Sequence, residues 1–141
     1  MQSVRVHLIS LQSDGRNQEK VDVMAKGAVY ERDGIWCLAY VTESEKPEEK
    51  LRQQVEIWPG KTVVKTKGEL ENRLTFCMGR RLQAEYRTPY GELPIEVLTR
   101  KHQVKRDAEL GYSEIVLGYT LYLQNDYLAD YQMKISIEKE N

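Results

Sequence analysis

The sequence predicts an all-β protein, an antiparallel up-and-down meander of about eight to ten strands that closes into a barrel. Short segments in which apolar and polar residues alternate fill the chain from Val4 to Lys139. Turn residues separate these segments, and the connections between them are short enough for hairpins. The chain has no amphipathic helix of the length that a crossover connection needs, which excludes a parallel sheet.

Closure of the sheet follows from the number of strands. An open sheet of about ten strands would expose two edges and leave its apolar face uncovered. A length of 141 residues suits one hydrophobic core, so we expect a single domain over residues 1–141. The sequence has no internal repeat of fixed period, which argues against propellers and solenoids.

The first strands are the clearest ones. Apolar and polar residues alternate over residues 4–8, and the contrast is lost at Ile9 and Leu11. A second strand covers residues 21–31. Gly27 lies inside that second strand and marks a bulge or a bend that helps the sheet to curl. Asp33 and Gly34 form a tight hairpin turn because both residue types tolerate positive φ. The third strand covers residues 35–41.

The middle of the chain is less regular. We favour a solvated loop over residues 43–50, where Pro47 precedes two glutamates and a lysine, although one helical turn is the alternative. A strand then resumes near Arg52. Residues 58–61 and 67–69 are turn or break signals on either side of the strand that contains Val63 and Val64.

The second half of the chain alternates with a period of two. Gly79, the turn at Pro89, the break at residues 107–111 and the turn at Asn125 and Asp126 separate its strands. The expected strands cover residues 73–78, 82–86, 93–104, 115–123 and 131–137.

Composition points to an ordinary folded protein in the cytoplasm. Twenty-one basic and 22 acidic side chains nearly balance, which argues against a disordered tail or a wholly basic binder. The N-terminus has no uninterrupted apolar core, and no stretch approaches the roughly 18 apolar residues that span a bilayer. We therefore expect no contact with a membrane. Cys37 and Cys77 are too few for a disulfide scaffold, so we expect reduced thiols.

One family resemblance covers nearly the whole chain. It rests on Thr88-Pro89-Tyr90-Gly91 followed by Glu92-Leu93, on Lys26-Gly27 and Tyr30 before the Asp33-Gly34 hairpin, and on Tyr119-Thr120-Leu121 before Asn125. These residues resemble the YwiB-type family of bacterial domains of unknown function. The resemblance implies a calycin-like, lipocalin-like β-barrel and a bacterial setting, and it implies no catalytic residues.

Turn chemistry by itself accounts for the TPYG string. Proline fixes φ at the second turn position and Gly91 suits the fourth, so we favour a turn over a binding role. Tyr90 at such a tip could still gate the mouth of a barrel. Gly34-Ile35-Trp36 matches the short G-x-W string of lipocalins, but it opens the third strand rather than the first, and chance explains it better.

No motif supports catalysis or a metal site. A zinc site needs three or four converging ligands, and the two histidines, His7 and His102, and the two cysteines have no paired short spacing. The sequence lacks a nucleophile elbow, a P-loop and a dinucleotide fingerprint. Acidic pairs such as Glu48-Glu49 lie in polar breaks, where solvated carboxylates are expected. We therefore lean away from an enzyme and expect no cofactor and no metal.

We expect the protein to bind a small, partly apolar ligand or a protein partner through the open end or rim of the barrel. An eight-stranded barrel is just wide enough to be filled by side chains or to hold one small ligand. The residues expected at the interior or mouth are Trp36, Tyr40, Tyr86, Tyr90, Tyr119 and Tyr131. Tyr30 and Tyr122 are two more tyrosines whose hydroxyls could donate to a ligand. The middle is filled instead if the following residues point inward: Val6, Val23, Leu38, Val64, Leu82, Ile95, Leu117 and Ile135.

The alternative is a regulatory barrel that binds nucleic acid or an acidic protein. Residues 61–106 hold 11 basic and 5 acidic side chains, whereas residues 107–141 hold 2 and 7. The densest basic residues are Arg80, Arg81, Arg100, Lys101, Lys105 and Arg106. We favour neutralisation of these strands by acidic neighbours, because no aromatic signature of an RNA-binding fold accompanies the charge. The sequence leaves the oligomeric state open.

Overall fold

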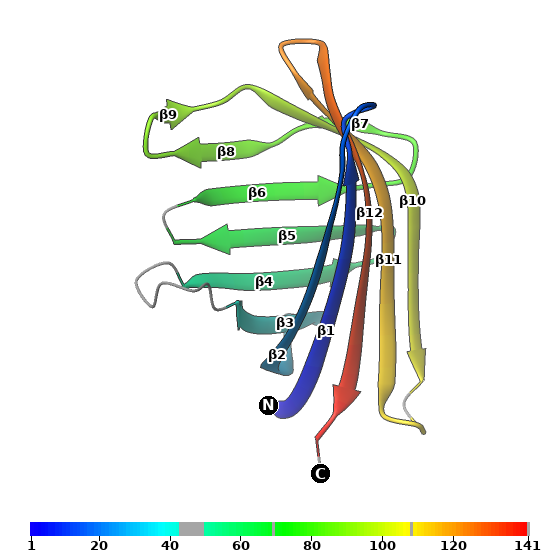
Figure 1. The fold of residues 1–141 in the computed structure, drawn as a ribbon. Coiled ribbons are helices and arrows are strands. Elements are labelled where there is room, and N and C mark those ends of the chain that lie inside the picture. Colours follow the sequence, from blue (N-terminus) through cyan, green and yellow to red (C-terminus); the bar gives the residue numbers. More distant parts are fainter. Residues whose placement is uncertain (43–49, 69, 108, 141) are drawn as a thin grey trace.

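The computed structural model describes residues 1–42, 50–68, 70–107 and 109–140. These residues form one antiparallel sheet that curls into a half-barrel, and they contain no helix (Figure 1). No helix that could cross a membrane is therefore found in the described part of the chain. The strands are β1 (Gln2–Ser13), β2 (Gln18–Arg32), β3 (Ile35–Thr42), β4 (Leu51–Trp58), β5 (Lys61–Lys67), β6 (Glu71–Phe76), β7 (Arg81–Gln83), β8 (Glu85–Thr88), β9 (Gly91–Glu92), β10 (Ile95–Asp107), β11 (Tyr112–Leu123) and β12 (Asp126–Lys139).

The prediction of an all-β antiparallel barrel fold is confirmed. The strand order is β7-β10-β11-β12-β1-β2-β3-β4-β5-β6-β8-β9, so most neighbours in the sheet are also neighbours in the chain. Twelve strands are described rather than eight to ten, because β7, β8 and β9 are pieces of three, four and two residues. Three pairings join strands that are not neighbours in the chain: β1 pairs with β12, β6 with β8, and β7 with β10.

The pairings of β7 and β8 bring the two ends of the sheet together. β7 and β8 follow each other along one extended segment with Ala84 between them. β7 pairs with β10, whereas β8 pairs with β6. The amide of Ala84 donates to the carbonyl of Ile95, and the amide of Leu93 donates to the carbonyl of Tyr86, both at 2.9 Å. One short segment therefore contacts both ends of the curled sheet.

β2 connects the two walls of the half-barrel. In Figure 1 the long strands β1, β2, β10, β11 and β12 form one wall together with the short β7, and β3 to β6, β8 and β9 run across it. β2 pairs with β1 over residues 18–29 and with β3 over residues 27–32, so Gly27 lies in the short stretch that pairs with both strands. The register passes through Gly27 without a shift, so this glycine marks a bend and a close approach rather than a bulge.

The turn residues follow the predicted chemistry with one correction. Asp33 and Gly34 have φ values of 54° and 79°, which confirms the predicted hairpin between β2 and β3. The turn between β11 and β12 uses Gln124 and Asn125, with φ of 51° and 71°, and not Asn125 and Asp126. Glutamine gave no turn signal in the sequence, which placed the turn one residue too late. The predicted loop at residues 43–50 falls outside the described residues except for Lys50.

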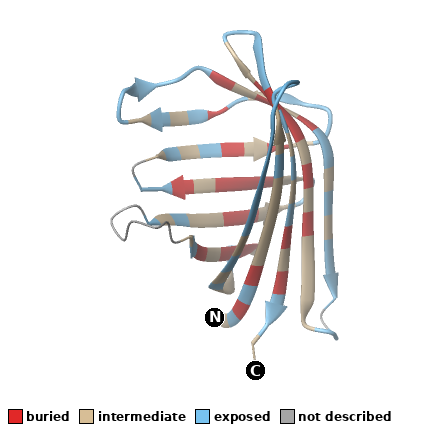
Figure 2. Cartoon of the chain, viewed as in Figure 1, coloured by how far each residue is buried: buried red, intermediate tan, exposed pale blue. Residues whose placement is uncertain are grey.

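The apolar side chains meet inside the curl, and buried residues recur along the strands of both walls (Figure 2). Six of the eight residues expected to fill the middle belong to this core: Val6, Leu38, Val64, Ile95, Leu117 and Ile135. The other two, Val23 and Leu82, are only half-buried. The middle of the half-barrel is therefore packed with side chains, and any space for a ligand lies toward its ends.

Candidate functional site

Aromatic side chains from both walls gather on the inner face of the sheet. The rings of Tyr119 on β11 and Tyr131 on β12 stack at 4.9 Å with an interplanar angle of 4°. Phe76 at the end of β6 approaches Tyr119 at 4.6 Å and a tilt of 56°. Such pairs are worth about 0.5–1.5 kcal/mol beyond the apolar area that they bury. We call Phe76, Tyr86, Tyr119 and Tyr131 the tyrosine cluster.

Strand register explains why these residues meet. Tyr119 and Tyr131 are direct cross-strand partners, and their alternation places both on the inner face. Tyr86 on β8 faces the same interior. Burial raises the pKa of Tyr119, and the phenols of Tyr131 and Tyr86 raise it further. Burial and the phenol of Tyr86 also raise the pKa of Tyr131, so all three tyrosines are neutral at physiological pH.

The hydroxyls of the tyrosine cluster have no hydrogen-bond partner among the described residues. The same holds for Tyr40 on β3, which is 6% exposed. The one buried side-chain oxygen in the described chain that is sealed from solvent without a partner is Oγ1 of Thr99, which pairs with Tyr119 across β10 and β11. Because the tyrosine hydroxyls are not sealed in this way, water can reach each of them. Buried hydroxyls normally find a partner.

Burial of Tyr40 predicts a loss of stability at alkaline pH. Burial raises the pKa of Tyr40 to about 12, above its ordinary value of 10.0. The unfolded chain therefore ionises first, so the stabilisation is complete below pH 10 and is lost as the pH rises toward 12. We expect this residue to contribute about 2–3 kcal/mol to the fall in unfolding free energy over that range. Urea unfolding at pH 8, 10, 11 and 12 measures it.

The control for that measurement removes only the hydroxyl group of a tyrosine. Tyr40→Phe should flatten the dependence between pH 10 and 12, whereas Tyr90→Phe, at a fully exposed site, should leave it unchanged. Equal slopes for the wild type and Tyr40→Phe would show that the buried phenol does not cause the alkaline loss.

Other tyrosines predicted from the sequence lie elsewhere. Tyr30 faces outward and accepts a hydrogen bond from Nε2 of Gln54 at 2.9 Å. Tyr122 also faces outward, and the guanidinium of Arg81 lies 4.0 Å from its ring centroid. Tyr90 is fully exposed between β8 and β9.

The turn that carries Tyr90 is held by one hydroxyl. Oγ1 of Thr88 accepts from the amide of Tyr90 at 3.1 Å and donates to the carbonyl of Gly91 at 3.0 Å. The turn expected for the TPYG string is therefore present, and Tyr90 does not line the interior.

Trp36 lies apart from the tyrosine cluster, toward the end of the half-barrel where the chain begins. It is 8% exposed, and the guanidinium of Arg106 lies 4.2 Å from its ring centroid. This contact joins Trp36, predicted to bind an apolar ligand, to Arg106, predicted to belong to a basic strip. No local pattern predicts this contact, because 70 positions separate the two residues.

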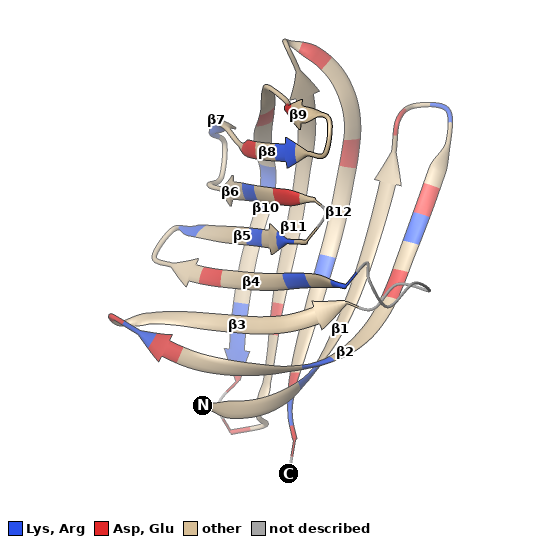
Figure 3. Cartoon of the chain, turned by 90° about the vertical axis from the view of Figure 1, so that its left-hand side faces the viewer, with Lys and Arg blue, Asp and Glu red and all other residues tan. Residues whose placement is uncertain are grey.

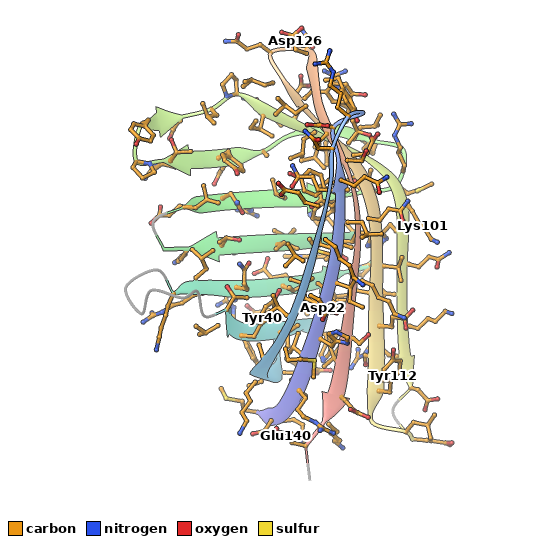
Figure 4. All side chains as sticks on the ribbon, in the orientation of Figure 1. Asp22, Tyr40, Lys101, Tyr112, Asp126 and Glu140 are labelled. Carbon is orange, nitrogen blue, oxygen red and sulfur yellow. The ribbon has the colours of Figure 1, made fainter. Side chains whose placement is uncertain are left out.

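Basic and acidic residues are mixed along the strands in Figure 3. The six residues of the predicted basic strip do not form one surface. Arg81 is paired with Glu96 at 3.2 Å, and Lys105 lies beside Glu114 across β10 and β11. Arg106 points to the inner face, whereas Lys101 lies on the outer side of β10 (Figure 4).

Arg80, Arg100 and Lys101 have no carboxylate within ion-pair distance among the described residues. Nε of Arg100 donates to Oγ1 of Thr120 at 2.9 Å, and that hydroxyl donates to Asp130 at 2.6 Å. Arg100 and Lys101, together with Lys134, line an outer groove of about 570 Å³. The charge of the middle strands is therefore divided between both faces of the sheet.

The histidines and cysteines are dispersed. His7 binds Asp22 at 2.7 Å on the outer face, and His102 binds Oγ1 of Thr62 at 2.7 Å. The second contact joins β10 to β5 across the interior, and burial lowers the pKa of His102. Cys37 and Cys77 are free thiols. The described residues contain no group of three His, Cys, Asp or Glu side chains that could hold a metal ion.

Sequence reasoning missed three residues at these sites. Phe76 and Thr99 occupy ordinary inward positions of alternating strands. Only the ring contact of Phe76 with Tyr119 and the pairing of Thr99 with Tyr119 connect them to the tyrosine cluster. Lys139 near the C-terminus lies close to the pocket beside Trp36. Alternation could have placed each on a face of the sheet, but it could not pair residues from distant strands.

Comparisons with known proteins agree with the fold. A family model described as a domain of unknown function (DUF1934) matches residues 6–135. An uncharacterized β-barrel protein, YwiB of Bacillus subtilis (strain 168), is 24% identical over 135 residues, which cover 96% of this chain and 92% of that protein. The crystal structure of the YwiB protein from the same species superposes with a TM-score of 0.85 at 22% identity, covering 99% of this chain and 93% of the other. The resemblance predicted from the sequence is confirmed.

Proposed function

This chain belongs to the DUF1934 family, a domain of unknown function, and we propose that its half-barrel binds a small, partly apolar molecule at the tyrosine cluster without covalent chemistry. The observation that carries the proposal is the set of hydroxyls on Tyr86, Tyr119 and Tyr131 that lack protein partners next to an apolar wall. Ligand sites are typically apolar surfaces with a few convergent polar groups. A ligand with an apolar body and one or two hydrogen-bonding atoms fits this description.

Several features of the described residues support a binding protein rather than an enzyme. The tyrosines are neutral and can donate or accept hydrogen bonds, but their raised pKa values make them poor bases at physiological pH. The continuous strand order supports one domain over residues 1–141. The free thiols of Cys37 and Cys77 are consistent with a cytoplasmic protein, which we include in the proposal together with the calycin-like classification.

Removing one hydroxyl tests the proposal. Tyr119→Phe keeps the ring contacts and deletes an oxygen that has no protein partner, so the unfolding free energy should change by less than about 1 kcal/mol. Loss of a hydrogen bond to a ligand should weaken binding by about tenfold. Native mass spectrometry of freshly purified protein detects a retained molecule, and titration with 8-anilinonaphthalene-1-sulfonate provides a probe of defined chemistry.

Tyr122→Phe is the matched control, since it lies on the same strand but faces outward against Arg81. We expect Tyr122→Phe to retain both the bound mass and the dye affinity of the wild type. Equal binding by Tyr119→Phe, Tyr131→Phe and the wild type would refute the assignment to the tyrosine cluster.

The alternative function, contact with nucleic acid or an acidic protein, rests on a different face. Its support is the outer groove, where Arg100 and Lys101 have no described acidic partner. Salt-dependent retention on heparin, lost in the double variant Arg100→Gln/Lys101→Gln, would favour this alternative. A protein that passes through heparin at low salt would exclude it.

A further inference from the structure

A second inner site lies at the end of the half-barrel where β1 begins, β10 and β12 end and Gly111 precedes β11 (Figure 1). It is a pocket of about 300 Å³. We call it the terminal pocket. Its apolar wall consists of Val4, Val29, Trp36 and Ile137, and its cationic side chains are Arg106 and Lys139. This site is separate from the tyrosine cluster, and its argument does not depend on the proposed function.

The wall of the terminal pocket is part of the folded core. Val4, Trp36 and Ile137 are 2%, 8% and 3% exposed. They come from β1, β3 and β12, so both walls of the half-barrel contribute to the pocket. The indole Nε1 of Trp36 has no hydrogen-bond partner among the described residues, and it is not sealed from solvent. An apolar surface with one open donor at the edge of Trp36 therefore faces this end of the protein.

Arg106 is placed over that surface by the fold. It lies on β10 beyond the segment that pairs with β7, and its guanidinium carbon is 4.2 Å from the ring centroid of Trp36. A guanidinium that stacks on an indole keeps its N–H groups free at the edge, where they can bind a carboxylate in bidentate geometry. No carboxylate in the described chain lies within ion-pair distance of it.

Lys139 supplies the second cation. Its backbone amide donates to the carbonyl of Gly111 at 2.8 Å, and its side chain crosses Gly111 so closely that a Cβ there would lie 3.0 Å from the Cβ of Lys139. No ion pair of Lys139 is described. The acidic residue in the lining, Asp107, accepts the amide of Leu110 at 3.0 Å. The terminal pocket thus has two cations that form no ion pair among the described residues and one carboxylate, Asp107, that accepts a turn amide.

We propose that the terminal pocket binds a small organic anion with a flat apolar body, such as an aromatic carboxylate. Its volume is at the lower end of the range for ligand sites, which suits a molecule with a single ring and a short side chain. The ring lies against Val4, Val29 and Ile137 beside the edge of Trp36, whose face Arg106 covers, and the carboxylate lies between Arg106 and Lys139. Because the charges are at the rim and the wall is apolar, a neutral ligand of the same shape lacks half of the interactions.

A matched pair of probes tests the charge requirement. Phenylacetate and phenylacetamide have the same ring and nearly the same size, but only the first is an anion. In ¹H–¹⁵N spectra, phenylacetate should shift the indole N–H signal of Trp36 in a saturable way. The indole signal of Trp58, which donates to Glu56 on the outer face, should not move and serves as an internal reference. Phenylacetamide should bind at least about tenfold more weakly.

Substitutions test whether the two cations bind the carboxylate of the probe. Arg106→Gln and Lys139→Gln should each weaken phenylacetate binding by about tenfold or more, because each removes a charge-assisted hydrogen bond. Arg5→Gln is the control, since Arg5 lies at the same end but faces outward and pairs with Glu138 at 3.2 Å. Its affinity should equal that of the wild type. The dispersion of both indole signals verifies that every variant is folded.

Three outcomes would overturn the inference. These are equal affinity for the two probes, unchanged affinity in both Arg106→Gln and Lys139→Gln, and phenylacetate shifts that map to Tyr119 and Tyr131 instead of Trp36. The last outcome would support the tyrosine cluster as the binding site. If phenylacetate still binds at Trp36 in Tyr119→Phe, the terminal pocket binds the ligand without the tyrosine cluster. Failures of the two proposals are therefore distinguishable.

Discussion

Gly27→Ala should destabilise the protein by about 3 kcal/mol, although it adds a single methyl group. A Cβ at Gly27 would lie 2.5 Å from the carbonyl oxygen of Ala39 and 3.0 Å from Cβ of Tyr40. The first contact is with the backbone of the partner strand, so it can be relieved only by separating β2 from β3. Since β2 joins the two walls at this residue, the strain would spread to both.

Urea unfolding followed by tryptophan fluorescence measures this effect. The predicted loss corresponds to a fall of roughly 10 °C in Tm for a protein of this size. Gly118→Ala is the matched control, because Gly118 is also a strand glycine and its Cβ would meet the side chain of Lys101 at 3.1 Å, with that residue's backbone no nearer than 3.7 Å. We expect a cost below about 1 kcal/mol there. Equal unfolding midpoints for Gly27→Ala and the wild type would disprove the close-approach argument.

Phe76→Ala should cost about 3–5 kcal/mol of stability and should also weaken the tyrosine cluster. Phe76 is completely buried, and its ring supports Tyr119 from the opposite wall at 4.6 Å. Deleting the ring leaves a cavity between β6 and β11 that the packed middle of the half-barrel cannot fill without moving both walls. Tyr119 loses a contact that fixes its orientation against Tyr131.

Chemical denaturation and dye titration together separate the two effects. Phe76→Leu fills most of the volume and should cost less than about 1.5 kcal/mol, whereas Tyr90→Ala removes an aromatic ring at a fully exposed site and should be nearly neutral. If Phe76→Ala unfolds like Tyr90→Ala, the ring at position 76 is not part of the structural core. A stable Phe76→Ala protein with unchanged dye affinity would also show that Phe76 does not contribute to binding at the tyrosine cluster.

Local patterns predicted most of the strands. Alternation with a period of two and the Asp33-Gly34 turn are local signals, and both held in the structure. The turn at Gln124 and Asn125 was misplaced by one residue because glutamine seldom adopts positive φ. The position of β7 was also not predictable, since the same extended segment pairs with β10 before Ala84 and with β6 after it.

The candidate sites were predictable only as residue types. The sequence selected Tyr86, Tyr119 and Tyr131 among other tyrosines, but it could not separate them from Tyr30 and Tyr122. Cross-strand contacts make that distinction, because they place Tyr30 against Gln54 and Tyr122 against Arg81 on the outer face.

By itself, the sequence determined that this chain forms an antiparallel sheet with one apolar face, because side-chain alternation and turn chemistry act over a few residues. Only the tertiary structure decided which distant strands face one another. That arrangement filled the middle, brought the tyrosines together at one place and set Arg106 over Trp36 at another. Contacts between strands far apart in sequence depend on how the sheet curls, which no local pattern encodes.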